Sequence, residues 1–133
     1  MKTARILAVA VILVASGLAL RVARSQQTGV KRTELQRHDL SIPGREVVQM
    51  RGDFPSGVAT PKHTHPGEEI VYVLEGAFEF QLEGQAPVTL KPGEVLFVPA
   101  GTVHQAKNVG GGNSVALSTY IVEKGKPLIT VVQ

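Results

Sequence analysis

The chain has 133 residues, the length of a single domain, and a formal charge of +3. Four of its 14 basic side chains (Lys2, Arg5, Arg21 and Arg24) lie within the first 25 residues, which leaves ten basic groups against all 11 acidic ones in the rest. A basic surface for nucleic acid is therefore not expected on the folded part. The sequence has no cysteine, which excludes disulfides, thiolate metal sites and a cysteine nucleophile.

Residues 1–25 have the features of a secretory signal peptide. Two basic residues precede a nearly unbroken apolar run over residues 6–20, and the small side chains of Ala23 and Ser25 place a cut before Gln26. As a helix this run would rise about 22 Å, short of the roughly 30 Å hydrocarbon core of a bilayer. Two arginines directly after it leave a short membrane anchor as the alternative. In either case we expect the domain to be exported, to a bacterial periplasm, with membrane contact only if the leader is uncleaved.

The next segment is polar and the rest has the pattern of a β-protein. Residues 26–44 are expected to form a polar arm before a domain at 45–133. In that domain, short β-branched runs alternate with Gly and Pro, and no stretch has the apolar spacing of a helix. The expected strands are Val47–Met50, Ile70–Leu74, Ala77–Leu82, Val88–Leu90, Val95–Val98, Val115–Val122 and Leu128–Val132. This spacing predicts an antiparallel sandwich or barrel. Ile70–Leu74 and Val95–Val98 are apolar on both faces, so we expect them to be central strands covered on both sides.

Three of the four histidines form a candidate metal site. His63 and His65 are one residue apart, which places both imidazoles on the same face of a strand. Glu68 and Glu69 follow closely, and a third imidazole, His104, completes the set if the fold brings its strand alongside. Neutral imidazole together with carboxylate suits first-row divalent ions. Spacing favours Glu69 over Glu68 because 63, 65 and 69 share a parity.

Two spacing motifs surround these residues. The first is Gly57, five residues, His63-Thr64-His65, three residues, Glu69, six residues and Gly76; the second is Gly93, five residues, Pro99, one residue, Gly101, two residues, His104, three residues and Asn108. At every fixed position they resemble the two motifs of the cupin superfamily, over roughly residues 45–125. The first box is also similar to that of germins, which usually have four residues rather than three between the second His and the Glu.

The resemblance implies an all-β fold, an antiparallel jelly-roll (double-stranded β-helix) barrel with a metal inside its mouth. It implies His63, His65, Glu69 and His104 as ligands of one divalent transition metal ion, which could be Fe, Mn, Ni, Cu or Zn. The motif glycines and Pro99 would shape turns, and Asn108 would be structural. It also implies a homodimer, with residues 30–50 or Leu128–Val132 available as edge strands.

Such a site leaves coordination positions open, which is typical of a catalytic rather than a structural metal. We expect a dioxygenase-like oxidoreductase of the quercetin dioxygenase type that acts on a small organic substrate, with Glu69 as ligand and possible general base. Activation of metal-bound water for proton transfer is a further possibility. The pocket wall is expected to be apolar, with Val71, Val73, Phe78 or Phe80, Phe97 and Ala106 as candidates. The alternative function is a non-catalytic module that binds a metal or a small ligand.

Overall fold

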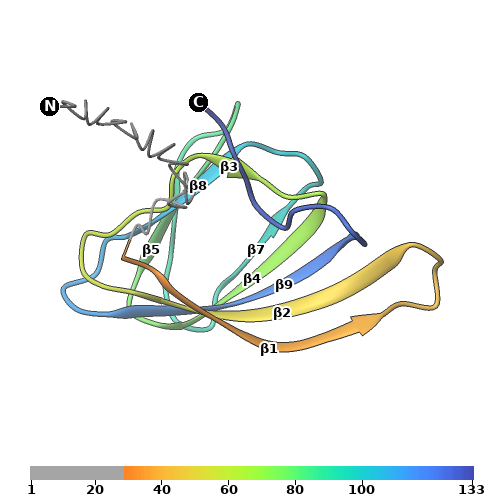
Figure 1. The fold of residues 1–133 in the computed structure, drawn as a ribbon. Coiled ribbons are helices and arrows are strands. Elements are labelled where there is room, and N and C mark those ends of the chain that lie inside the picture. Colours follow the sequence, from red (N-terminus) through yellow and green to blue (C-terminus); the bar gives the residue numbers. More distant parts are fainter. Residues whose placement is uncertain (1–28) are drawn as a thin grey trace, which may run out of the picture.

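The computed structural model describes residues 29–133, so the expected signal peptide or anchor lies outside the described residues. Ten strands form two five-stranded sheets in this range (Figure 1). The strands are β1 (Lys31–Asp39), β2 (Arg45–Phe54), β3 (His63–Thr64), β4 (Gly67–Glu75), β5 (Phe78–Leu82), β6 (Val88–Leu90), β7 (Val95–Val98), β8 (His104–Asn108), β9 (Ser114–Glu123) and β10 (Thr130–Val131). Between residues 29 and 133 no helix is long and apolar enough to cross a membrane.

The two sheets face each other across a common interior. One has the strand order β1-β2-β9-β4-β7 and the other β10-β3-β8-β5-β6, and the registered strand pairs are antiparallel. Strands distant in sequence, such as β2 and β9 or β4 and β9, therefore lie side by side (Figure 1). The predicted all-β jelly-roll architecture is confirmed.

Two apolar clusters fill the interior. The larger joins the sheets through aromatic side chains: Phe54 and Phe78 pack edge to face with ring centroids 4.9 Å apart. The smaller contains Val48, Tyr120 and Val122. Strands β4 and β5 alternate buried and more accessible residues, as expected for strands with one face on a core.

The apolar runs located most of the strands. Val88–Leu90 and Val95–Val98 coincide with β6 and β7, and the other five predicted runs overlap β2, β4, β5, β9 and β10. The short strand β3 and strand β8 were not among the predicted apolar runs, although the histidine spacing places His63 and His104 on strands. Both contain histidines of the candidate site, and both are too short or too polar to form an apolar run.

The expectation of a polar arm over residues 26–44 is wrong for Lys31–Asp39, which form β1 at the edge of the first sheet. Every residue of β1 is exposed. β1 pairs on one side only and both of its faces are exposed, so it needs no apolar pattern that would reveal it. β1 pairs with β2 along its whole length, with a register shift between Glu34 and Gln36.

The second correction concerns the strands expected to be covered on both faces. β4 is central, but β7 is an edge strand, and the outer face of both is open. Its exposed apolar side chains are Ile70, Tyr72, Leu74, Val95 and Phe97. We call these five residues the outer apolar face. Ile70 pairs with Phe97 and Tyr72 with Val95, so the face is continuous across the two strands.

Glycines occupy the turns that need a left-handed backbone. The motif glycines Gly57, Gly76, Gly93 and Gly101 all have positive φ, between 69° and 87°. Gly76 has a second constraint, because a Cβ there would lie 2.0 Å from Ser114 Oγ. Gly84 has a similar φ of +77°, but a Cβ there would meet nothing within 4 Å.

These two glycines allow crowding to be separated from backbone strain. Gly84→Ala should lower the free energy of unfolding by about 1–2 kcal/mol, the cost of a left-handed non-glycine residue. Gly76→Ala should lower it by about 2–5 kcal/mol, because overpacking adds to the same strain. Urea denaturation followed by circular dichroism measures both. Equal losses would contradict the crowding at Ser114.

Candidate metal centre

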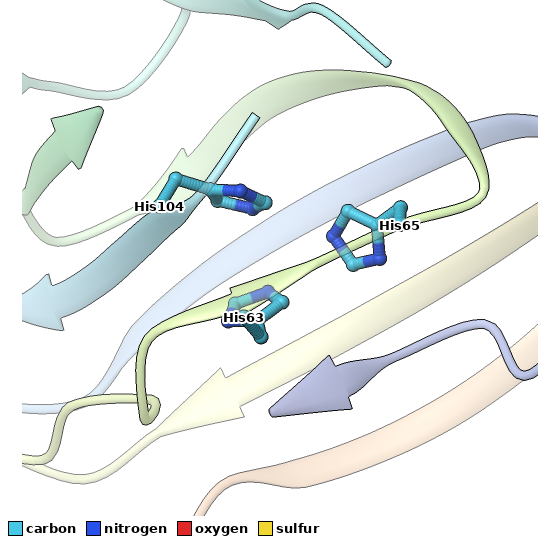
Figure 2. A group of neighbouring side chains, drawn as sticks. All are labelled: His63, His65 and His104. Atoms are coloured by element: carbon cyan, nitrogen blue, oxygen red, sulfur yellow. The ribbon is translucent and has the colours of Figure 1, made fainter. Parts of the chain in front are cut away.

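Pairing between β3 and β8 creates the histidine cluster. His63 lies directly opposite His104 in this pairing, and His65 follows β3 by one residue. Figure 2 shows the three rings converging from the two chain segments. The ligand-capable nitrogens of His63, His65 and His104 all lie within 4.8 Å of one another, and all three residues are buried. The sequence therefore identified three side chains that the fold brings together.

Backbone carbonyls fix the orientation of each imidazole. Each Nδ1 lies within hydrogen-bond distance of one: Pro61 O for His63 (2.8 Å), Leu128 O for His65 (2.6 Å) and Thr102 O for His104 (2.9 Å). A carbonyl oxygen can only accept, so each Nδ1 carries the proton and donates. In the neutral ring the lone pair is then on Nε2. This is the arrangement in which a second partner prepares a histidine to bind a metal.

Glu69 lies on β4 beside this cluster. Its Oε2 is 3.1 Å from Nε2 of His65 and 3.1 Å from Nε2 of His104. A carboxylate oxygen only accepts, and these Nε2 atoms hold lone pairs when Nδ1 is protonated, so a cation is needed between them. Either a second proton on the ring or a metal ion satisfies the set. The residues present thus fit a divalent ion with nitrogen and oxygen ligands.

Glu68 lies on the opposite face of β4. It is half-buried, whereas Glu69 is buried and alternates with Val71 and Val73 on the inner face. The strand alternation therefore keeps the Glu68 carboxylate away from the histidines. This agrees with the preference for Glu69 that spacing and parity suggested.

Burial and the Glu69 charge set the protonation of the site. Burial lowers the pKa of His63 to about 4, so this ring is neutral at physiological pH. Burial also opposes the charged form of His104, but its contact with Glu69 outweighs this and raises its pKa. For Glu69, burial opposes ionisation, yet the contacts with His104 and His65 hold its pKa below the usual range. Burial and the nearby Glu69 charge raise the pKa of Tyr120, which stays protonated.

A cavity of about 40 Å³ opens beside His63, Glu69 and His104. This is room for a few water molecules. The other lining residues are mostly apolar, with three hydroxyls and one arginine: Arg32, Met50, Gly52, Phe54, Thr60, Phe78, Phe80, Ala106, Ala116, Ser118 and Tyr120. Apolar walls and the imidazoles of His63 and His104 thus border the same cavity.

The cavity wall differs in part from the expected one. Phe78, Phe80 and Ala106 line it as predicted. Val71 and Val73 are buried in the core but do not line it, and Phe97 is 57% exposed on the outer apolar face, so these three were wrongly placed in the wall. Tyr120 and Arg32 also line the cavity and were not predicted to do so. Tyr120 pairs directly with Glu69 across β9 and β4, a contact that depends on the sheet register. Arg32 lies in the segment that was expected to be an arm.

Asn108 stabilises the far end of the barrel. It is 1% exposed, and its Nδ2 donates to the carbonyls of Phe54 and Gly112, both at 2.8 Å. Its Oδ1 accepts from Gly110 N at 2.8 Å and Ser114 Oγ at 2.7 Å. This buried amide is fully hydrogen-bonded within the fold, which is a structural role.

A family model described as "Cupin domain" matches residues 50–130. The chain belongs to the cupin family. The matched range contains both spacing motifs and all four candidate ligands, so the resemblance seen in the sequence is confirmed.

The relatives of this cupin include both enzymes and germin-like proteins. "Dimethylsulfoniopropionate lyase DddQ" of Ruegeria pomeroyi is 43% identical over 41% of this chain and 27% of its own length. "Germin-like protein subfamily 2 member 2" of Arabidopsis thaliana is 39% identical over 59% of this chain and 40% of its own length. Among solved structures, an oxalate oxidase in complex with the substrate analogue glycolate superposes with a TM-score of 0.65 and 26% identity, over 81% of this chain and 57% of the other. The chain thus spans well under half the length of these two curated relatives.

Proposed function

We propose that this cupin is an exported, metal-dependent oxidoreductase of the dioxygenase type, acting on a small organic substrate. The observation that carries the proposal is the convergence of three buried imidazoles whose Nδ1 atoms are engaged by backbone carbonyls, with Glu69 within 3.1 Å of two of them. The proposed ligands are Nε2 of His63, His65 and His104 and the carboxylate of Glu69. One divalent transition metal ion, whether Fe, Mn, Ni, Cu or Zn, is compatible with this set.

A metal of this class supplies a Lewis acid and, where it is redox-active, an electron-transfer centre. The chain's own residues prepare the surroundings of that centre. Phe78 and Phe80 give the cavity apolar walls, and a less polar environment strengthens electrostatic interactions inside it. Glu69 is ionised and can hold a proton on its carboxylate, which makes it the candidate general base. Tyr120, kept protonated, can donate a hydrogen bond toward a developing negative charge.

The relatives support an enzyme but differ in reaction. One is named a lyase and another an oxidase. Oxidation would consume O₂, whereas elimination would remove a proton and expel a leaving group with its electron pair, without an oxidant. The main alternative is a non-catalytic module that binds the metal or a small ligand. It is favoured by the small cavity, in which Glu69 is the only lining carboxylate and is also a proposed ligand.

Metal retention tests the ligand assignment. His104→Ala should abolish bound metal, and Glu69→Gln should weaken metal affinity about 10- to 100-fold, whereas the matched change Glu68→Gln should have no effect. The measurement is elemental analysis of protein recovered from a periplasmic fraction, with circular dichroism to check folding. Equal metal loss in Glu68→Gln would overturn the assignment of Glu69. Recovery only from the cytoplasm would overturn export.

Turnover distinguishes the enzyme from the binding module. Metal-loaded protein should consume O₂ with at least one member of a panel of catechols, flavonols, β-diketones and oxalate, and His104→Ala should reduce the rate to that without protein. An oxygen electrode measures the uptake, and product analysis under nitrogen detects elimination. Tight binding of a panel member without turnover in either assay would contradict the enzyme and support the module.

We also propose that a second copy of the chain covers the outer apolar face. This face carries five large apolar side chains, with the half-buried Glu68 at its end on β4, so its apolar part is complementary to itself, as a two-fold interface requires. It ends at β7, whose outer edge is unpaired within the described residues. These features support a homodimer formed by packing of the β4–β7 faces.

The oligomeric mass tests this proposal. Wild-type protein should elute in light-scattering chromatography with twice the mass of the mature chain, and Phe97→Asp should shift it to a single chain because a charge would be buried. The control is Ile42→Asp, which changes a residue that is 63% exposed in the loop between β1 and β2. A wild-type mass of one chain, or equal dissociation in the control, would contradict this interface.

A further inference from the structure

Arg32 lines the cavity but has no part in the proposed metal centre. It lies on the edge strand β1 and lines the same cavity as His63, Glu69 and His104. In the sheet it is directly opposite Gly52, which is opposite Ala116 on β9. Directly opposed residues lie on the same face of a sheet, and both of these neighbours line the cavity. The Arg32 side chain therefore lies on the cavity side of the sheet, beside the two small residues Gly52 and Ala116.

The guanidinium of Arg32 has no acidic partner. Of the arginines in residues 29–133, Arg37, Arg45 and Arg51 each have a carboxylate within 4.0 Å, and Arg32 alone has none. Its positive charge nevertheless acts on the site: burial raises the pKa of Tyr120, and Arg32 opposes that rise. An unpaired guanidinium beside an apolar cavity is a ready partner for an anion, which it can bind with two parallel hydrogen bonds.

The rest of the cavity indicates what kind of anion would fit. Besides the proposed ligands, its walls are apolar or carry the hydroxyls of Thr60, Ser118 and Tyr120. Glu69 is the only acidic lining residue, and its Oε2 is directed at two histidines. A molecule with an apolar body and one negative end therefore matches the wall, with the negative end on Arg32.

Distance and volume limit the length of this molecule. Arg32 is in register with Gly52 and Ala116, and Glu69 pairs with Tyr120. Ala116 and Tyr120 are four residues apart on β9, which corresponds to a strand rise of about 13 Å between the two rows. The long arginine side chain spans part of that interval. The cavity volume of about 40 Å³ admits only a short chain between the guanidinium and the histidines.

We propose that Arg32 binds the carboxylate of a small aliphatic organic acid whose opposite, oxygen-bearing end is placed at the histidine cluster. This inference rests on the proposed function and names its substrate class. Arg32 is a specificity residue: it holds the substrate by its charged end and presents the other end to the metal centre. Arg32 is also exposed, so its charge is accessible to an incoming anion.

Calorimetric titration with defined probes tests the role of Arg32. The probes are the dicarboxylates from oxalate to glutarate and their uncharged diamides, added to Mn²⁺-loaded protein. Wild type should prefer one chain length and bind the matching diamide weakly. Arg32→Gln should weaken the best dicarboxylate about ten- to a hundredfold and remove the length preference, and Arg32→Lys should restore part of the affinity.

The matched control is Lys31→Gln. It removes the same charge from the neighbouring residue, which is opposite Asp53 and does not line the cavity. Equal weakening in this variant would show a general charge effect and overturn the proposal, as would unchanged affinity in Arg32→Gln or absence of carboxylate binding by metal-loaded wild type. Failure of the proposed function has a separate signature, namely no retained metal in elemental analysis. In that case the same titration of metal-free protein decides the role of Arg32.

Discussion

The three hydrogen bonds from imidazole Nδ1 atoms to backbone carbonyls are the constraint on which the site depends. The accepting carbonyls belong to Pro61, Thr102 and Leu128, which precede β3, β8 and β10. All three strands are in the second sheet. Because the carbonyls can only accept, the bonds fix one tautomer and direct each Nε2 lone pair inward. The orientation of the three imidazoles therefore depends on the packing of this sheet. Rotation of any of these rings would break a buried hydrogen bond.

Along the inner face of the first sheet, the residues change from a proposed metal ligand near the histidines to small residues at the other end of the cavity. The row of Glu69 and Tyr120 is next to the histidines, and the row of Ser118 and Met50 is two residues further along. The row of Gly52 and Ala116 follows, where small side chains leave space. The second sheet supplies the histidines and two phenylalanines of the wall. Each sheet thus contributes half of the cavity, which explains why the barrel must close before a binding site exists.

Sequence patterns predicted the features that depend on local chemistry. Alternation along β5 and the positive-φ turns at motif glycines follow from the residues themselves. The pattern failed where burial depends on neighbours. β1 is polar because an edge strand needs no apolar face, and Phe97 is apolar yet lies on the outside of the sheet. The apolar character of a strand does not by itself show which of its faces is covered.

The sequence alone determined seven of the ten strands, the cupin motifs and the identity of the candidate ligands, because spacing and residue type encode these directly. The tertiary structure decided which partners each of them has. It placed His63 opposite His104 and brought the Leu128 carbonyl to His65, 63 residues away in the chain. It also aimed Arg32 into the cavity through the register of β1 and β2. Such contacts arise from strand pairing between distant segments, which no local stretch of sequence specifies.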